Sequence, residues 1–292
     1  GICPDPDHKG PGIRILEIIA KGPLQHGESK ASAGVIIEKI DGTPIAPAMN
    51  YFPLLNRKDG KRTLLSFHDP ATGKRWEEVI KPIPARKEYD LLYERWIESR
   101  AKATEKLSKG RVGYVHVRSM NDESFRKTYS RVLGPENDKE ALVVDTRFNG
   151  GGWLHDDLVT FLSGKPYLQF FPRGQGNLGG EPLGKWSKPS AVIIGESNYS
   201  DAHMFPYSYK AHNVGKLIGM PVPGTATAVW WETLIDPSLY FGIPQVGMRT
   251  PDGTLLENTQ LEPDIMVANR PEHTANGRDR QLEEAVKQLL NE

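Results

Sequence analysis

The hydrophobic and polar positions of the first 85 residues follow the period of strands. β-Branched and apolar residues recur in short runs that are separated by Gly, Pro and Asp. The run at 34–42 ends in Asp41-Gly42, which is a turn signal, and residues 47–55 predict a short helix. The pattern therefore predicts a small, mostly β module with strands at 12–19, 34–42, 63–69 and 75–83.

The pattern changes to a helical period after Pro84. Over 86–110, apolar residues such as Leu92 and Trp96 share one face and charged residues take the others, which predicts one long linker helix. From 111 to 292, apolar runs alternate with helical segments, which is typical of a parallel-rich α/β layer with helices on its faces. We expect strands at 112–117, 141–144, 191–195 and 216–219, and helices at 122–133, 153–162, 201–210 and 279–290.

The stretch ALVVDTRFNGGG, at 141–152, combines a buried strand with a glycine-rich turn. Consecutive glycines leave backbone N–H groups uncovered and allow positive φ values. A strand end, a glycine turn and a helix N-terminus form a concave set of donors, which can hold a phosphate or the oxyanion of an acyl-transfer intermediate. A tight turn without a ligand explains the stretch equally well, because the dinucleotide and P-loop signatures are absent.

A serine follows the next buried strand. In AVIIGESNYSDAHMF, at 191–205, Ser200 stands where a helix should begin, at the positive end of the helix dipole. The N–H of Asp201 points the same way and can serve as an oxyanion donor. Most serines in this position only cap the helix. The third helical position, however, holds His203 rather than Glu or Gln, so no capping box completes that arrangement.

A nucleophilic serine needs a base. Among the eight histidines, His203 follows Ser200 by about one helical turn, and His155 lies on the helix after the glycines. A side chain on the same helix usually points along the surface, so we expect both to be ordinary, partly exposed histidines. No histidine pair has metal-ligand spacing, and we predict no metal and no other cofactor. Glu257 reads by itself as a solvated loop carboxylate.

Composition narrows the function classes. The 37 basic and 37 acidic residues cancel, which gives no support to nucleic-acid binding or to a polybasic membrane contact. No apolar run approaches the ~18 residues of a membrane-spanning helix. The single Cys3 excludes an intramolecular disulfide and a cysteine-based zinc site. The first twelve residues lack the layout of a signal peptide, so we interpret them as a cut point, with any cytoplasmic or periplasmic localisation signal upstream.

Together, these motifs resemble the tricorn-type serine peptidases of the tail-specific, C-terminal-processing protease group. The resemblance rests on VVDTRFNGGG, SDAHMF, GKLIG, LENTQLEPD and the linker YERWIESRAKATEKLSKGRVGYVHV. In addition, VIIEKIDGTPI at 35–45 resembles the strand and turn of a PDZ domain, which binds an extended peptide at a sheet edge. The resemblance implies a PDZ-like domain at 1–85, a linker helix at 86–110, and a core domain at 111–292 with a crotonase/ClpP-like α/β fold.

Carried over residue by residue, the resemblance makes Ser200 the nucleophile and Glu257 the catalytic carboxylate on the histidine side of the relay. The Asp201 N–H and one of Gly151 and Gly152 would form the oxyanion hole. The family also implies peptide or unfolded protein substrates. As partners it implies upstream core and propeller domains of the same polypeptide, and further copies in a homo-oligomer.

Two departures from the family pattern bear on mechanism and specificity. The turn at 223–226 has no lysine, which disfavours the Ser-Lys branch and favours the histidine-based branch, whose base lies upstream of the PDZ module. We therefore expect a fragment that lacks its base and is nearly inactive alone. The tricorn type has an acidic residue in the pocket for the residue before the scissile bond. The matching stretch, in a surface loop expected at 164–188, has Gln169, Phe170 and Phe171 instead, which favours apolar residues.

The main prediction is thus a tricorn-like serine peptidase that hydrolyses peptides through an acyl-enzyme. Two alternatives come from other classes. A non-catalytic module would bind peptides without turnover. An acyl-CoA enzyme of the crotonase type would use the glycine turn to stabilise a thioester enolate, but the PDZ-like module and Ser200-Asp201 argue against it.

Overall fold

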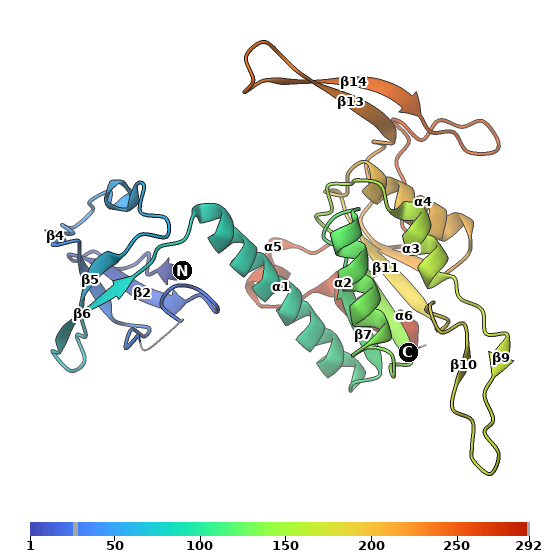
Figure 1. Ribbon diagram of the computed structural model, residues 1–292, viewed down its shortest axis with the longest axis horizontal. Coiled ribbons are helices and arrows are strands. Elements are labelled where there is room, and N and C mark those ends of the chain that lie inside the picture. Colours follow the sequence, from blue (N-terminus) through green and yellow to red (C-terminus); the bar gives the residue numbers. More distant parts are fainter. Residues whose placement is uncertain (26–28, 291–292) are drawn as a thin grey trace. The chain divides into compact units, whose positions relative to one another are not determined.

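The computed structural model describes residues 1–25 and 29–290 of the 292-residue chain. They form two compact units, unit 1 over Gly1–Ser99 and unit 2 over Arg100–Glu292. Figure 1 labels the elements of both units. Helix α1, Ala85–Ser108, begins directly after Pro84 and runs across the boundary between the two ranges. None of the described helices combines the length and the apolar character that a membrane crossing would require.

Unit 1 is built on an antiparallel sheet with the strand order β1-β2-β3-β5-β6, and β4 pairs with β3. In β2, Ile13 and Ile15 are buried whereas Arg14 is exposed, which is the alternation of a sheet with one face in the core. Asp41 and Gly42 have φ values of 47° and 78° and form the two-residue turn between β3 and β4. The strands are β1 Ile2–Pro4, β2 Ile13–Ile18, β3 Ile36–Ile40, β4 Thr43–Pro44, β5 Thr63–His68 and β6 Arg75–Ile80.

The helix expected at 47–55 is much shorter in the structure, where only a 3₁₀ turn forms, η1 at Phe52–Leu55. Ala48 adopts a φ of 57°, which lies outside the right-handed helical region. Pro53 stands in the first turn, where a missing N–H is tolerated. Ala48 therefore cannot belong to a right-handed helix, and the 3₁₀ turn begins only after it.

Unit 2 contains a five-stranded parallel sheet with the strand order β15-β12-β11-β8-β7. The central strands β8 and β11 are buried at every position, as expected of strands covered on both faces. The predicted alternation of strands and helices is therefore confirmed for this unit. The strands are β7 Val112–His116, β8 Ala141–Asp145, β11 Ser190–Ile194, β12 Lys216–Gly219 and β15 Ile265–Met266.

Helices α2, α3 and α4 pack on one face of this sheet. Leu142 and Val144 of β8 belong to the core that these three helices complete. Helix α6 contacts the same strands but buries a separate set that includes Leu282 and Val286, which places it on the opposite face. The helices of unit 2 are α2 Asp122–Leu133, α3 His155–Leu162, α4 Asp201–Ala211, α5 Pro271–Ala275 and α6 Arg280–Leu290.

Two strand pairs of unit 2 stand outside the sheet. β9, Leu168–Gln169, and β10, Gly180–Glu181, pair within the segment expected to be a loop. β13, Thr227–Thr233, and β14, Tyr240–Gly247, form a longer antiparallel ribbon that the sequence reading did not anticipate. Figure 1 shows this ribbon extending away from the helices of unit 2. Its large apolar side chains, such as Trp231, are exposed.

Candidate active site

Two strand-to-helix turns of unit 2 meet at one edge of the sheet. Strands β8 and β11 are parallel neighbours, with Asp145 opposite Ile193. Each strand is followed by a turn and then by the N-terminus of a helix, α3 after β8 and α4 after β11. Because the carboxyl ends of parallel strands lie at the same edge, the two helix N-termini face one region, which is where ligands bind in open α/β sheets.

The first turn, after β8, requires its glycines. Gly151 and Gly152 have φ values of 94° and 141°, which favour glycine. A Cβ added to Gly151 would lie 2.7 Å from Ser200 Cβ and 2.7 Å from the Tyr199 carbonyl oxygen, so the two turns touch at this point. The buried Asn149 holds the turn: its Nδ2 donates to the Val117 carbonyl at 2.8 Å, and its Oδ1 accepts the Gly151 N–H at 2.8 Å.

The second turn, after β11, holds Ser200 in a strained conformation. Ser200 has φ 56° and ψ −122°, a region that a non-glycine residue adopts only when its surroundings enforce it. It stands at the N-cap position of α4, yet its side chain makes no capping hydrogen bond. Its backbone N–H instead donates to Thr225 Oγ1 at 3.1 Å. The capping explanation for this serine is therefore wrong, and its hydroxyl is left to another purpose.

The Asp201 carboxylate ties the two turns together. It is buried and accepts the backbone N–H groups of Leu154 at 2.5 Å and His155 at 3.1 Å, so it caps α3 rather than its own helix. Its Oδ1 also lies 2.5 Å from His155 Nδ1, and this hydrogen bond raises the pKa of His155. In the described part of the chain, the backbone N–H groups of Asp201 and Gly152 donate to no protein acceptor. The Gly150 N–H likewise donates to no protein acceptor among the described residues, so the meeting point has three unpaired donors.

Glu257 lies beside the same region. Its Oε2 accepts the Ala226 N–H at 2.9 Å and the Thr227 hydroxyl at 2.7 Å. The segment 225–227 therefore contacts Ser200 through Thr225 and Glu257 through its next two residues. Glu257 is partly buried, which differs from the solvated loop carboxylate that it suggested alone.

The two histidines near Ser200 differ from each other. His155 is partly exposed, as expected. His203 is only 1% exposed, which corrects the expectation of a partly exposed side chain. The reason is that α4 presents His203 to the interior of the unit rather than along its surface. Burial lowers the pKa of His203, although the nearby Glu257 carboxylate acts in the opposite direction.

Ser200 and Glu257 line one cavity of about 590 Å³, together with Gly150, Gly152 and Asp201. The structure thus brings Ser200, Glu257 and the unpaired backbone N–H groups into one hollow. Gln169, Phe170 and Phe171 are not among the described residues that line it. They lie on the exposed β9–β10 segment, so their role in a substrate pocket stays a prediction. Part of the remaining wall comes from the β13–β14 ribbon and the residue after it, including Val229, Trp231 and Met248, and part from Trp153, Tyr199 and Met204.

A buried ion-pair network connects the start of the first turn to Asp279, near the end of the chain. The Arg147 guanidinium pairs with Asp145, with Nε to Oδ1 at 2.9 Å, and with Asp279, with Nη2 to Oδ2 at 3.0 Å. Burial disfavours the charged form of Asp279, but Arg147 outweighs it and lowers the pKa of that carboxyl to about 2. Asp279 directly precedes α6, so this helix is linked to the residue that begins the glycine turn.

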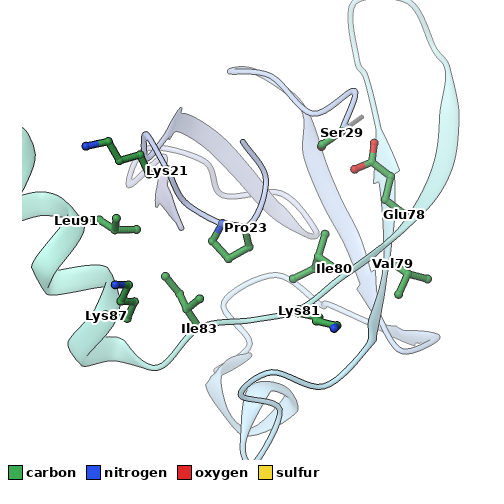
Figure 2. A pocket seen from close by; sticks show the side chains of 10 residues that line it. All are labelled: Lys21, Pro23, Ser29, Glu78, Val79, Ile80, Lys81, Ile83, Lys87 and Leu91. Carbon is green, nitrogen blue, oxygen red and sulfur yellow. The ribbon is translucent and has the colours of Figure 1, made fainter. Parts of the chain in front are cut away.

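Unit 1 has a separate cavity of about 730 Å³. Figure 2 shows Ile80 from β6, Ile83 from the connector and Leu91 from α1 around it, with Lys21 and Lys87 at its margin. β6 is an edge strand of its sheet. An apolar hollow with lysines beside an edge strand suits the binding of a chain segment, and it has no glycine turn to hold an oxyanion.

Sequence reasoning missed Asn149, Thr225 and Trp231. Asn149 is visible in retrospect within NGGG, since Asn side chains commonly bond the backbone two residues on. Thr225 had no signal, because its partner is distant in sequence. Trp231 had one: 227–233 reads TAVWWET, which is rich in the β-branched and aromatic residues of strands.

Comparison with known proteins relates the chain to a peptidase family. Residues 111–267 match the family model described as Peptidase family S41. The Tricorn protease homolog of Saccharolobus solfataricus is 29% identical over 276 residues, covering 93% of this chain and 25% of the relative. The Tricorn protease of Thermoplasma acidophilum is 26% identical over 260 residues, covering 89% of this chain and 24% of the relative. The chain thus spans about a quarter of the length of these curated relatives.

A comparison of structures agrees on the fold. The crystal structure of the tricorn protease matches with a TM-score of 0.82 and 23% sequence identity. The match covers 100% of this chain and 29% of that one. At this identity the likeness concerns the fold alone.

Proposed function

This chain belongs to peptidase family S41, and from that premise we propose that it is the catalytic part of a tricorn-like serine peptidase that hydrolyses peptides through an acyl-enzyme. Ser200 attacks the carbonyl carbon of the scissile bond. The Asp201 and Gly152 N–H groups stabilise the oxyanion. The Gly151 N–H is excluded from that role, because it is donated to Asn149. Glu257 orients the base, which takes the serine proton and passes it to the leaving amine.

The single observation that carries this proposal is the backbone of Ser200. A capping serine gains a hydrogen bond, whereas this one is held at a positive φ without a cap and lines a cavity. Strain of this kind persists where the surroundings enforce it, and it clusters at active sites. A sharp turn from a strand to a helix that exposes a serine hydroxyl is also the arrangement of other serine hydrolases.

Labelling with a fluorophosphonate, read by intact and peptide mass, tests the proposal. We expect the base to lie in another part of the polypeptide, so Ser200 should label in a chain extended upstream and much more slowly in residues 1–292. Labelling of Ser200 at the same rate in both would assign the base to this chain. No labelling in either would refute the nucleophilic role of Ser200.

We further propose that residues 1–85 are a PDZ-like domain, that 86–110 is the linker helix, and that 111–292 is a crotonase/ClpP-like catalytic layer. The Asp41-Gly42 turn, the antiparallel sheet and the parallel sheet of unit 2 support this division. Upstream core and propeller domains and a homo-oligomeric assembly are further proposals. They are consistent with the short span of this chain on its relatives.

Peptide binding without catalysis is a second proposal, and it concerns unit 1. The apolar cavity beside the edge strand β6, with Lys21 and Lys87 at its margin, favours it. Titration of the full chain with unlabelled peptides should saturate while Ile83→Asp weakens binding. Binding of coenzyme A thioesters in the same assay would support an acyl-CoA enzyme instead.

A further inference from the structure

The wall of the catalytic cavity opposite the glycine turn is one face of the β13–β14 ribbon. Side chains alternate across a strand. Thr227, Val229 and Trp231 share one face of β13, and all three line the cavity with Ser200. Trp230 belongs to the other face, where its Nε1 donates to Glu232 Oε1 at 2.6 Å. Trp231 therefore lies on the cavity side of the ribbon, and Trp230 lies on the opposite side.

Trp231 has a defined place on its face. It pairs across the ribbon with Gly242, and Val229 pairs with Pro244. A Cβ added to Gly242 would lie 2.9 Å from Val229 and 3.1 Å from the Trp231 ring, so the indole lies over the glycine backbone. Yet 67% of Trp231 remains exposed. An exposed large aromatic at the mouth of a catalytic cavity offers apolar surface to an incoming molecule.

The charges around the cavity favour an uncharged occupant. No lysine, arginine or histidine is among the described residues that line it. The two carboxylates there, Asp201 and Glu257, already accept hydrogen bonds from the protein. A negatively charged substrate side chain would therefore lose water without gaining an ion partner, and a positively charged one would have to compete with the protein donors that already occupy both carboxylates. An apolar side chain would gain by covering Trp231, Val229 and Met248.

We propose that this face of the ribbon is the specificity pocket of the peptidase, and that it selects a large apolar residue immediately before the scissile bond. The inference rests on the proposed function, since it takes Ser200 as the attacking group. Trp231 and Val229 are the specificity-determining residues. Met248, which follows β14, completes the apolar wall.

Binding to the full-length protein carrying Ser200→Ala tests the pocket without requiring turnover. Fluorescence polarisation would compare peptides with Phe, Leu, Lys or Asp before the intended scissile bond. The Phe and Leu peptides should bind about tenfold more tightly than the charged ones. Trp231→Ala should remove that preference, with about a tenfold loss for the Phe peptide. Trp230→Ala is the matched control, because it removes the same side chain from the opposite face, and it should change affinity less than about twofold.

A second variant tests the same pocket by giving it a new preference. Val229→Asp places an unpaired carboxylate on the cavity face, and it should shift the preference toward the Lys peptide by about tenfold or more. Ile243→Asp, directly across the ribbon from Trp230 and absent from the described residues that line the cavity, should shift nothing. Equal losses from Trp230→Ala and Trp231→Ala, or tighter binding of the Lys peptide to the unmodified ribbon, would overturn the pocket.

The proposed function is read separately, by fluorophosphonate labelling of Ser200 in the protein with the native serine. A small probe does not need the pocket, so the labelling rate of the protein with an unmodified ribbon reports the nucleophile alone. Normal labelling without the binding preference refutes the pocket and keeps the peptidase. The binding preference without labelling refutes the nucleophile and keeps the pocket.

Discussion

The two turns that form the candidate site solve the same geometric problem differently. Both connect a buried parallel strand to a helix, and both contain residues at positive φ. After β8 the positive φ falls on Phe148, Gly151 and Gly152, whereas after β11 it falls on Ser200. The first turn is shaped so that its backbone can approach a neighbour closely. The second accepts strain in order to hold a hydroxyl at a fixed point.

The two turns also exchange their capping groups. Ser200 does not cap α4, and the cap of α3 comes from Asp201, which belongs to the other turn. The Asp201 side chain, which stands in the first turn of α4, thus caps α3 instead and links the two turns. The difference teaches that each turn leaves a backbone N–H unpaired, that only the second turn presents a hydroxyl, and that the Asp201 carboxylate links the two turns. The substitutions below remove these features one at a time, from the largest expected effect to the smallest.

The largest effect should come from Ser200. Ser200→Ala should abolish fluorophosphonate labelling and reduce peptide hydrolysis by the full-length protein by about 10⁶-fold. A capping serine would lose about 1 kcal/mol of stability on this change, but we expect the free energy of unfolding to stay within about 0.5 kcal/mol. Ser200→Gly should raise it by about 1 kcal/mol, because the strain is relieved. Urea unfolding measures both.

Gly151→Ala should be the most damaging change in the first turn. The new Cβ would meet Ser200 Cβ and the Tyr199 carbonyl, at a φ of 94° that alanine disfavours. We expect a loss of at least about 2 kcal/mol in the free energy of unfolding and slower labelling of Ser200. Gly150→Ala is the matched control for stability, because its Cβ would meet nothing within 4 Å. Similar melting temperatures for the two variants would contradict the close contact of the turns.

Asp201→Asn should weaken the side-chain link between the two turns while keeping the backbone N–H of residue 201. The amide keeps one acceptor oxygen but loses the charge that faces the N-terminus of α3 and His155. We expect a loss of about 1–3 kcal/mol in the free energy of unfolding, together with slower labelling of Ser200. Unchanged labelling would show that the link is purely structural.

His155 should give stability a pH dependence. Its folded pKa is raised by Asp201 above the unfolded value of about 6.5. A raised folded pKa contributes stability that is fully present below the unfolded pKa and is lost as pH rises through the folded pKa. His155→Gln should therefore destabilise most below pH 6.5, and the difference from the unmodified protein should shrink toward pH 9. A difference that grows with pH would contradict the pairing.

The smallest effect should come from Thr225→Val. It removes the acceptor of the Ser200 N–H while keeping the shape of the side chain. We expect a loss of about 1 kcal/mol in the free energy of unfolding. Thr259→Val changes a threonine whose hydroxyl contacts a carbonyl in an exposed turn, and it should cost less.

Much of unit 2 could be predicted because its elements are local. The apolar runs at 141–144 and 191–195 and the helical periods between them could each be recognised from the sequence, and the match over residues 111–267 places the chain in peptidase family S41. The boundaries moved by one or two residues. The β13–β14 ribbon was missed because its strands face solvent on both sides, so no clear alternation marks them.

The site could be predicted only as far as its motifs are contiguous. Ser200, Asp201 and the glycines stand in recognisable stretches, and the structure brings them together with Glu257 in one cavity. The capping of α3 by Asp201 joins positions 47 apart in sequence, which no local pattern encodes. The pocket residues at 169–171 were carried over from the family resemblance, whereas the described residues that line the cavity beside Ser200 include several from the β13–β14 ribbon.

The pair formed by Arg147 and Asp279 has a consequence for synthesis. The two residues are 132 positions apart. A ribosome adding about 5–20 residues per second delivers the carboxylate on the order of ten seconds after the arginine. Until then the nascent chain contains the glycine turn but not the Asp279 carboxylate that pairs with Arg147. The contacts that support the turn beside Ser200 are therefore completed late during translation, when most of unit 2 has already been synthesised.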